Sequence, residues 1–125
     1  MKESQFNFEN LQVYQKALDF VDVVYEVTKQ FPKSEFYNLT SQFKRAAVSI
    51  ALNIAEGAGD TDSQFGRFLQ IAHDSVKECV VCSTIAKRQN YITEGKDSEI
   101  RLKLAELSKM ISSLKKYLKG NHGPR

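Results

Sequence analysis

Apolar residues recur every three to four positions through four long segments of the chain, the spacing of amphipathic α-helices. The pattern predicts four helices, over residues 10–30, 36–56, 62–90 and 97–119. Asn10 is placed to cap the first helix, and the loop Thr93-Glu94-Gly95-Lys96 precedes the last. Because the connections are short and no segment shows convincing strand alternation, we predict an all-α fold, an antiparallel up-down-up-down four-helix bundle. It forms a single domain over residues 1–125, with a flexible tail at 120–125.

The first and last predicted helices carry more apolar surface than the core of one bundle requires. The first has two adjacent apolar rows, which consist of Leu11, Tyr14, Leu18, Val21 and Tyr25 and of Val13, Ala17, Phe20, Val24 and Val27. The last has an extra row of Leu102, Met110 and Tyr117. Surplus apolar rows are typical of subunit interfaces, so we predict a homo-oligomer. A wider core within one chain is the alternative.

The composition adds few constraints. Of the 125 residues, 42% are hydrophobic and 26% are charged, which is typical of one globular domain that needs no disulfide or metal scaffold. No apolar stretch reaches about 18 residues, so we expect no membrane span. Residues 1–5 are polar and lack the hydrophobic segment of a signal peptide, which predicts a cytoplasmic location.

The net charge of +3 conceals a strong asymmetry along the chain. Residues 1–100 hold 11 Lys or Arg and 14 Asp or Glu, whereas residues 101–125 hold 7 and 1. The predicted last helix carries the candidate nucleic-acid contacts Lys109, Lys115, Lys116 and Lys119. Such a patch can neutralise phosphates. The alternative is that these lysines complement the helix dipole and are solvated.

One face of the second predicted helix carries five polar residues, at steps of three and four: Gln42, Arg45, Ser49, Asn53 and Glu56. Ser75 and Glu78 of the third helix can face this stripe across the bundle. We interpret the seven residues as a structural polar network in which Arg45 pairs with Glu78 and fixes the helix register. A ligand or partner site is the alternative, and an active site is the least favoured.

Little in the sequence indicates catalysis, a metal or a cofactor. Cys79 and Cys82 form a C-x-x-C pair, but both fall on the apolar seam in the middle of a helix. In thiol oxidoreductases the motif lies instead at the N-terminus of a helix, directly after a strand. Two buried thiols are therefore favoured over a metal or redox site. His73 lacks the Glu-x-x-His spacing of di-iron bundles, because Gln70 stands three residues before it. We expect no enzyme activity, no metal and no cofactor.

Several blocks of sequence occur together in one order and spacing. They are Phe8-x-x-Leu11-x-Val13-Tyr14-x-Lys16-Ala17, Phe31-Pro32-x-x-Glu35, Leu39-Thr40-x-Gln42, Arg45-Ala46-Ala47-Val48-Ser49-Ile50, Asn53-Ile54-Ala55-Glu56-Gly57, and Phe68-Leu69-x-Ile71-Ala72 with Ser75 and Glu78. Over roughly residues 6–119 the chain resembles the four-helix-bundle proteins encoded in intervening sequences of bacterial large-subunit ribosomal RNA genes. These are often labelled a ribosomal protein family. The accessory variability protein of diversity-generating retroelements belongs to the same group.

The resemblance implies a homopentameric barrel and a nucleic-acid role, and it brings no catalytic residue. The family has a basic-Ser pair in the turn between the second and third helices. This chain has Asp60-Thr61-Asp62-Ser63 there, and acidic residues repel phosphate. We predict a non-enzymatic homo-oligomer that binds RNA or DNA through basic surfaces. The alternative is a protein-interaction scaffold, or an accessory subunit for a nucleic-acid-handling partner, without direct nucleic-acid contact.

Overall fold

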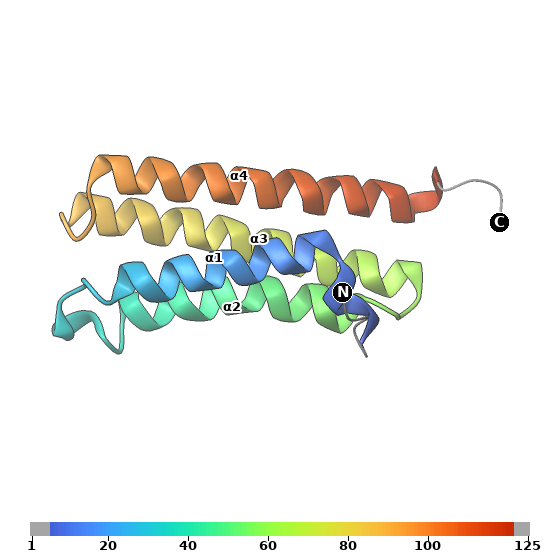
Figure 1. Ribbon diagram of the computed structural model, residues 1–125, viewed down its shortest axis with the longest axis horizontal. Helices are drawn as coiled ribbons and strands as arrows, with labels where there is room; N and C mark the ends of the chain where they lie inside the picture. Colours follow the sequence, from blue (N-terminus) through green and yellow to red (C-terminus); the bar gives the residue numbers. More distant parts are fainter. Residues whose placement is uncertain (1–5, 122–125) are drawn as a thin grey trace.

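The computed structural model describes residues 6–121 and confirms the all-α, up-down-up-down bundle (Figure 1). Its four helices are α1 (Gln12–Thr28), α2 (Leu39–Gly57), α3 (Asp62–Arg88) and α4 (Glu94–Lys116). Short turns of helix lie at Asn7–Asn10, Lys33–Glu35 and Tyr117–Asn121. One end of the bundle, the single-turn end, holds the α2–α3 turn with the start of α1 and the end of α4. The opposite, two-loop end holds the α1–α2 and α3–α4 connections.

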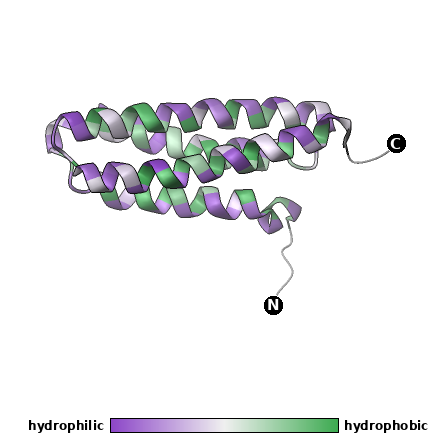
Figure 2. Ribbon diagram, turned by 90° about the horizontal axis from the view of Figure 1, so that it is seen from above, coloured by the Kyte–Doolittle hydropathy of each residue, from purple (hydrophilic) through white to green (hydrophobic). Residues whose placement is uncertain are grey.

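The core lies along the bundle axis, where each helix presents one apolar stripe (Figure 2). Of the two apolar rows of α1, the buried one consists of Val13, Ala17, Phe20, Val24 and Val27. The other row is partly exposed, with Leu18 and Tyr25 on the surface. On α4, Leu102 is 73% exposed. The single chain therefore leaves apolar surface uncovered on both helices.

The helices α2 and α3 form the most extensive contact of the bundle, and Gly57 makes their close approach feasible. A Cβ atom on Gly57 would lie 2.8 Å from the Cβ of Phe68 and 2.9 Å from the Cδ1 of Phe65. Gly57 is the last residue of α2, and the left-handed residue of the following turn is Gly59, with φ of 90°. The glycine at 57 is thus required by packing against α3, whereas the glycine at 59 suits the turn.

Two helix starts differ from the sequence prediction. Asn10 does not cap α1: it ends the preceding 3₁₀ turn, and Leu11 takes the N-cap position without a side-chain hydrogen bond. Thr93 caps α4 by accepting a hydrogen bond from the Lys96 N–H at 3.0 Å, so the helix begins at Glu94 instead of residue 97. A threonine cap outweighed the loop preference of Gly95. Of the predicted tail, residues 122–125 lie outside the described residues, as do residues 1–5.

None of the helices within residues 6–121 is both long enough and apolar enough to cross a membrane.

Candidate functional site

The four lysines singled out in the sequence divide into two sites near the single-turn end. Lys109 and Lys116 line a shallow depression of about 580 Å³ along α4, together with Ser112. Lys115 and Lys119 line a groove of about 560 Å³ between the end of α4 and the start of α3. We call it the basic groove; its lining residues are Asp62, Ser63, Gly66, Arg67, Gln70, Lys115, Leu118, Lys119 and Gly120.

The basic groove has cations on both walls. Arg67 comes from α3, and Lys115 and Lys119 come from α4 and its final turn. The Lys115 ammonium donates a hydrogen bond to Oε1 of Gln70. Within residues 6–121, neither Arg67 nor Lys119 makes a hydrogen bond or an ion pair. Sequence analysis missed Arg67, because its proximity to the lysines arises only when α3 and α4 pair.

The acidic α2–α3 turn adjoins this basic surface. Asp60 accepts a hydrogen bond from the Thr61 N–H at 2.8 Å, and the Thr61 hydroxyl in turn accepts one from the Gln64 N–H at 3.2 Å. These contacts cap α3. Asp62, in the first turn of α3, is the single acidic residue that lines the basic groove. The carboxylate of Asp60 therefore has a structural task, and that of Asp62 lowers the net positive charge of the groove.

Three of the seven residues of the predicted polar network, Ser49, Asn53 and Ser75, are joined to one another by hydrogen bonds within α2 and between α2 and α3. Ser75 donates to the Oγ of Ser49 at 2.9 Å. The Asn53 amide donates to the carbonyl and the hydroxyl oxygens of Ser49, at 2.8 and 3.0 Å. All three lie in partly buried contacts. They link the two helices midway along the bundle.

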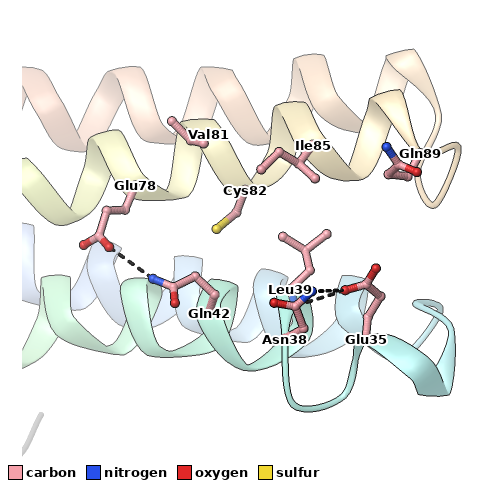
Figure 3. A pocket seen from close by; sticks show the side chains of 9 residues that line it. All are labelled: Glu35, Asn38, Leu39, Gln42, Glu78, Val81, Cys82, Ile85 and Gln89. Atoms are coloured by element: carbon pink, nitrogen blue, oxygen red, sulfur yellow. Dashed lines mark hydrogen bonds between the residues drawn. The ribbon is translucent and has the colours of Figure 1, made fainter.

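The expected ion pair between Arg45 and Glu78 is absent. Gln42 takes the position of the arginine and donates its amide to Glu78 Oε2 at 3.2 Å (Figure 3). Arg45 and Glu56 are exposed, and neither makes a hydrogen bond or an ion pair with any residue between 6 and 121. A shared helix face places side chains on one side, but it does not decide which of them reaches across to α3.

A second groove of about 480 Å³ runs between α2 and α3 toward the two-loop end (Figure 3). We call it the acidic groove; its lining residues are Glu35, Asn38, Leu39, Gln42, Glu78, Val81, Cys82, Ile85 and Gln89. Val81 and Ile85 are 55% and 41% exposed, so the groove presents apolar surface beside two carboxylates. Sequence analysis assigned only Gln42 and Glu78 from this set to a site.

The Glu35 carboxylate is held at the rim of the acidic groove by three donors. The Tyr91 hydroxyl donates to it at 2.9 Å, the Leu39 N–H at 3.2 Å and the Asn38 amide at 3.1 Å. The hydrogen bond from Tyr91 is the main cause that holds the pKa of Glu35 below its ordinary value. The same bond raises the pKa of Tyr91. Glu35 thus stays charged and links the α1–α2 connection to the α3–α4 loop.

Cys79 and Cys82 are buried in the core, as favoured from the sequence. Burial raises the pKa of Cys82 to about 11, and it raises the pKa of Cys79 further. Because the thiolate is the reactive form, both thiols are poor nucleophiles in the folded chain. His73 shares a hydrogen bond of 2.8 Å with Ser108 of α4. Across residues 6–121 no three metal-ligating side chains gather into a cluster.

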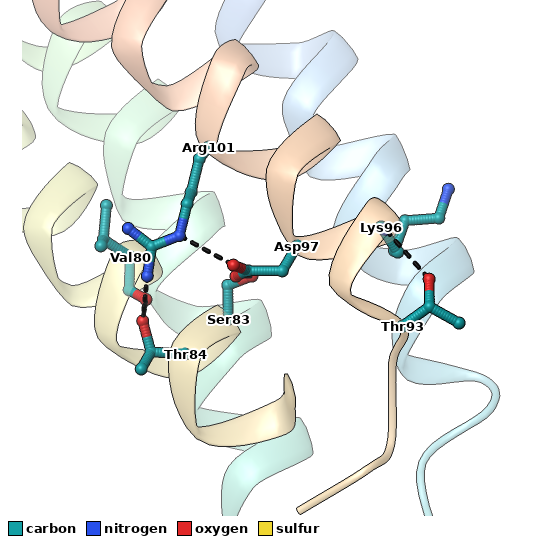
Figure 4. A network of polar contacts seen from close by, with 7 residues as sticks. All are labelled: Val80, Ser83, Thr84, Thr93, Lys96, Asp97 and Arg101. Carbon is teal, nitrogen blue, oxygen red and sulfur yellow. Dashed lines mark hydrogen bonds and ion pairs between the residues drawn. The ribbon is translucent and has the colours of Figure 1, made fainter. Parts of the chain in front are cut away.

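A polar network that sequence analysis missed joins α3 and α4 at the two-loop end (Figure 4). Asp97 is only 3% exposed and accepts hydrogen bonds from Ser83 at 2.6 Å and from Arg101 at 2.9 Å. Arg101 also donates to Thr84. Burial raises the pKa of Asp97, but these two hydrogen bonds and the charges of Arg101 and Lys87 outweigh it, so the pKa lies below its ordinary value. The sequence held one indication that Asp97 is buried. It lies three residues before Ile100 of the apolar seam, and this spacing places both on the same face of the helix.

The fold and these surfaces define a small antiparallel four-helix bundle with a basic groove and an acidic groove. A family model described as the 23S rRNA-intervening sequence protein matches residues 9–113, so the chain belongs to that family. The crystal structure of a protein with unknown function from the S23 ribosomal protein family of Bacteroides thetaiotaomicron has the same fold. It shares 24% identity, with a TM-score of 0.76, over 83% of this chain and 98% of the other. No curated protein matches the chain.

Proposed function

We propose that the protein is a non-enzymatic homo-oligomer that binds RNA or DNA through the basic side chains at the single-turn end. The observation that carries the proposal is the arrangement of cations there. Lys109 and Lys116 line one site and Lys115 and Lys119 the next, and Arg67 joins the second from another helix. Neutralising phosphates with clustered cations is the main source of nucleic-acid affinity. In an oligomer the surface is repeated, which multiplies that affinity.

The test is fluorescence anisotropy with a structured RNA and a single-stranded DNA over a salt series. A variant with Lys→Gln at all four candidate positions loses affinity. The slope of log affinity against log salt concentration becomes shallower by about one for each lysine that contacts a phosphate. The control variant has the same charge change away from this surface, at Lys29, Lys33, Lys44 and Lys77. Binding that is absent, insensitive to salt or equal in both variants contradicts direct nucleic-acid contact.

Apolar surface on α1 and α2 supports the homo-oligomer. Leu18 and Leu52, which is 61% exposed, border an apolar groove of about 290 Å³ between the outer faces of these helices. Exposed apolar patches of this kind are typical of interfaces. The family resemblance makes a pentamer the expected assembly. The occupant of the groove is a second copy of the chain.

Light scattering tests this assembly. The native protein has a mass several times the 14.2 kDa of one chain, and Leu18→Glu with Leu52→Glu shifts it toward the monomer. Ser98→Glu, on the exposed face of α4, is the control and leaves the mass unchanged. A monomeric mass for the native protein overturns the proposed oligomer.

The acidic groove favours a second function, a scaffold that docks another protein. Glu35 and Glu78 repel phosphate, whereas the exposed Val81 and Ile85 suit a basic, amphipathic helix. The test is affinity purification after nuclease treatment. A partner that is lost from Val81→Glu with Ile85→Glu, but retained by the four-lysine variant, supports the scaffold. A partner that the native protein retains before nuclease treatment but loses after it supports nucleic-acid binding instead.

A further inference from the structure

We propose that the basic groove binds the terminal phosphomonoester of a nucleic-acid strand, an inference that rests on the nucleic-acid binding proposed above. The groove is a hollow between two helices, and its cations stand on opposite walls: Arg67 on α3, and Lys115 and Lys119 on α4 and its final turn. An anionic group inside it is approached from two sides. The depression that holds Lys109 and Lys116 lies along α4 alone and is suited to the phosphodiesters inside a nucleic-acid strand.

The charge of the groove fits a dianion. Its lining residues include three cations and one carboxylate, Asp62, which gives a formal charge of +2. A phosphodiester inside a strand carries one negative charge, whereas a phosphomonoester carries about −1.5 to −2 at neutral pH. The first turn of α3 also lines the groove, through Asp62 and Ser63, and contributes the positive end of a helix of 27 residues. Both features favour the end of a strand over its interior.

Gly66 supplies an independent observation. It lies inside α3 and lines the groove, and its φ is not left-handed. A Cβ atom built there meets no other atom within 4 Å. Neither the backbone nor the packing therefore requires glycine, although glycine inside a helix costs about 1 kcal/mol relative to alanine. A bare backbone on the groove wall allows a ligand to approach closely.

The two basic sites adjoin, because Lys115 lines the groove and Lys116 lines the depression. A strand that lies along α4 on Lys109 and Lys116 can place its end in the groove. The acidic groove lies elsewhere, between α2 and α3 toward the two-loop end, and offers no competing phosphate site. The depression thus suits the phosphodiesters inside a nucleic-acid strand, and the basic groove suits its terminal phosphate.

The experiment compares one RNA sequence in four forms: with a 5′-phosphate, with a 3′-phosphate, with hydroxyl groups at both ends, and ligated into a circle. Fluorescence anisotropy with an internal label measures each affinity. We expect one or both phosphorylated forms to bind about fivefold more tightly than the hydroxyl and circular forms, as two or three charge-assisted hydrogen bonds allow. Inorganic phosphate, used as a competitor, abolishes this preference and leaves the circular form bound.

Two variants test the groove itself. Gly66→Leu fills it with a side chain that favours the helix, and Arg67→Gln removes one cation. Each reduces the preference for the phosphorylated form toward one, with little change for the circular form. Gly95→Leu, in the first turn of α4 at the two-loop end, is the matched control and keeps the preference.

The outcomes separate this inference from the proposed function. Equal binding of all four forms overturns the end-binding groove and leaves nucleic-acid binding intact. No binding of any form overturns both. A preference that survives in Arg67→Gln and Gly66→Leu shows that the end is held elsewhere on the protein, which also overturns the assignment. If Gly66→Leu does not fold, Arg67→Gln alone decides.

Discussion

The two ends of the α3–α4 pair use their charged residues in opposite ways. At the two-loop end, Asp97 is buried and hydrogen-bonded to Ser83 and Arg101. At the single-turn end, the helices part to form a groove lined by Arg67 and Lys119, which have no hydrogen bond or ion pair within the described residues. Charges that are satisfied inside the protein stabilise it, whereas charges left facing a groove contribute little to folding and are available to a ligand.

Asp97→Ala tests the stabilising end and has the largest expected effect. It leaves the buried Ser83 hydroxyl without its acceptor and removes the carboxylate partner of Arg101, which keeps only its hydrogen bond to Thr84. We expect the free energy of unfolding to fall by about 2–3 kcal/mol in urea denaturation. Glu94→Ala, an exposed acidic residue in the same helical turn, is the control and costs at most about 1 kcal/mol through the helix dipole. Equal losses in the two variants contradict a special role for Asp97.

The same carboxylate makes stability depend on pH. The pKa of Asp97 in the folded chain lies below its ordinary value of 3.8, so the folded state binds the proton less readily than the unfolded state. This contribution is complete above pH 3.8 and is lost as the pH falls through the lower folded pKa. Asp97→Asn lacks it. The difference in unfolding free energy between the native protein and Asp97→Asn narrows on acidification; a difference that stays constant between neutral pH and pH 3 contradicts the assignment.

Gly57→Ala tests the packing that holds α3 beside α2 at the single-turn end. The added methyl group would lie 2.8 Å from Phe68 Cβ and 3.2 Å from the Cα of Phe65, so the two helices must move apart. We expect a loss of about 2 kcal/mol, typical of overpacking, measured by urea denaturation. Gly95→Ala is the matched control, because its methyl group meets only the Thr93 hydroxyl, at 3.9 Å. A stable Gly57→Ala protein shows that the α2–α3 contact has room to adjust.

The helices and their order were predictable because the signal for them is local. Apolar residues at helical spacing mark each helix, although the spacing did not decide which of the two apolar rows of α1 is the buried one. The start of α4 was misplaced because Gly95 in isolation indicates a loop, whereas the Thr93 cap draws it into the helix. Local pattern thus predicts that an element exists better than where it begins.

The sites were less predictable, because they depend on which side chains meet across helices. Lys115 and Lys119 were candidates from charge alone, but the groove also needs Arg67 from the start of α3. The expected contact of Arg45 with Glu78 was wrong, since Gln42 occupies it. A helical pattern identifies a shared face, and only the three-dimensional pairing of two helices selects the partner.

Gly66→Ala has the smallest expected effect on the free energy of unfolding. Unlike the other substitutions, it is expected to raise it. A methyl group at this position meets no atom within 4 Å, and alanine favours the helix by about 1 kcal/mol, so the variant is more stable than the native protein by about that amount. The gain is measured by urea denaturation beside Gly57→Ala, which is the same glycine-to-alanine substitution but is expected to lower stability. A gain in stability together with weaker binding of phosphorylated RNA would mean that glycine at 66 serves the groove and not the fold. A loss of stability would show instead that α3 needs glycine here for its own structure. Gly66 would then no longer support the view that the single-turn end of the α3–α4 pair keeps residues for a ligand.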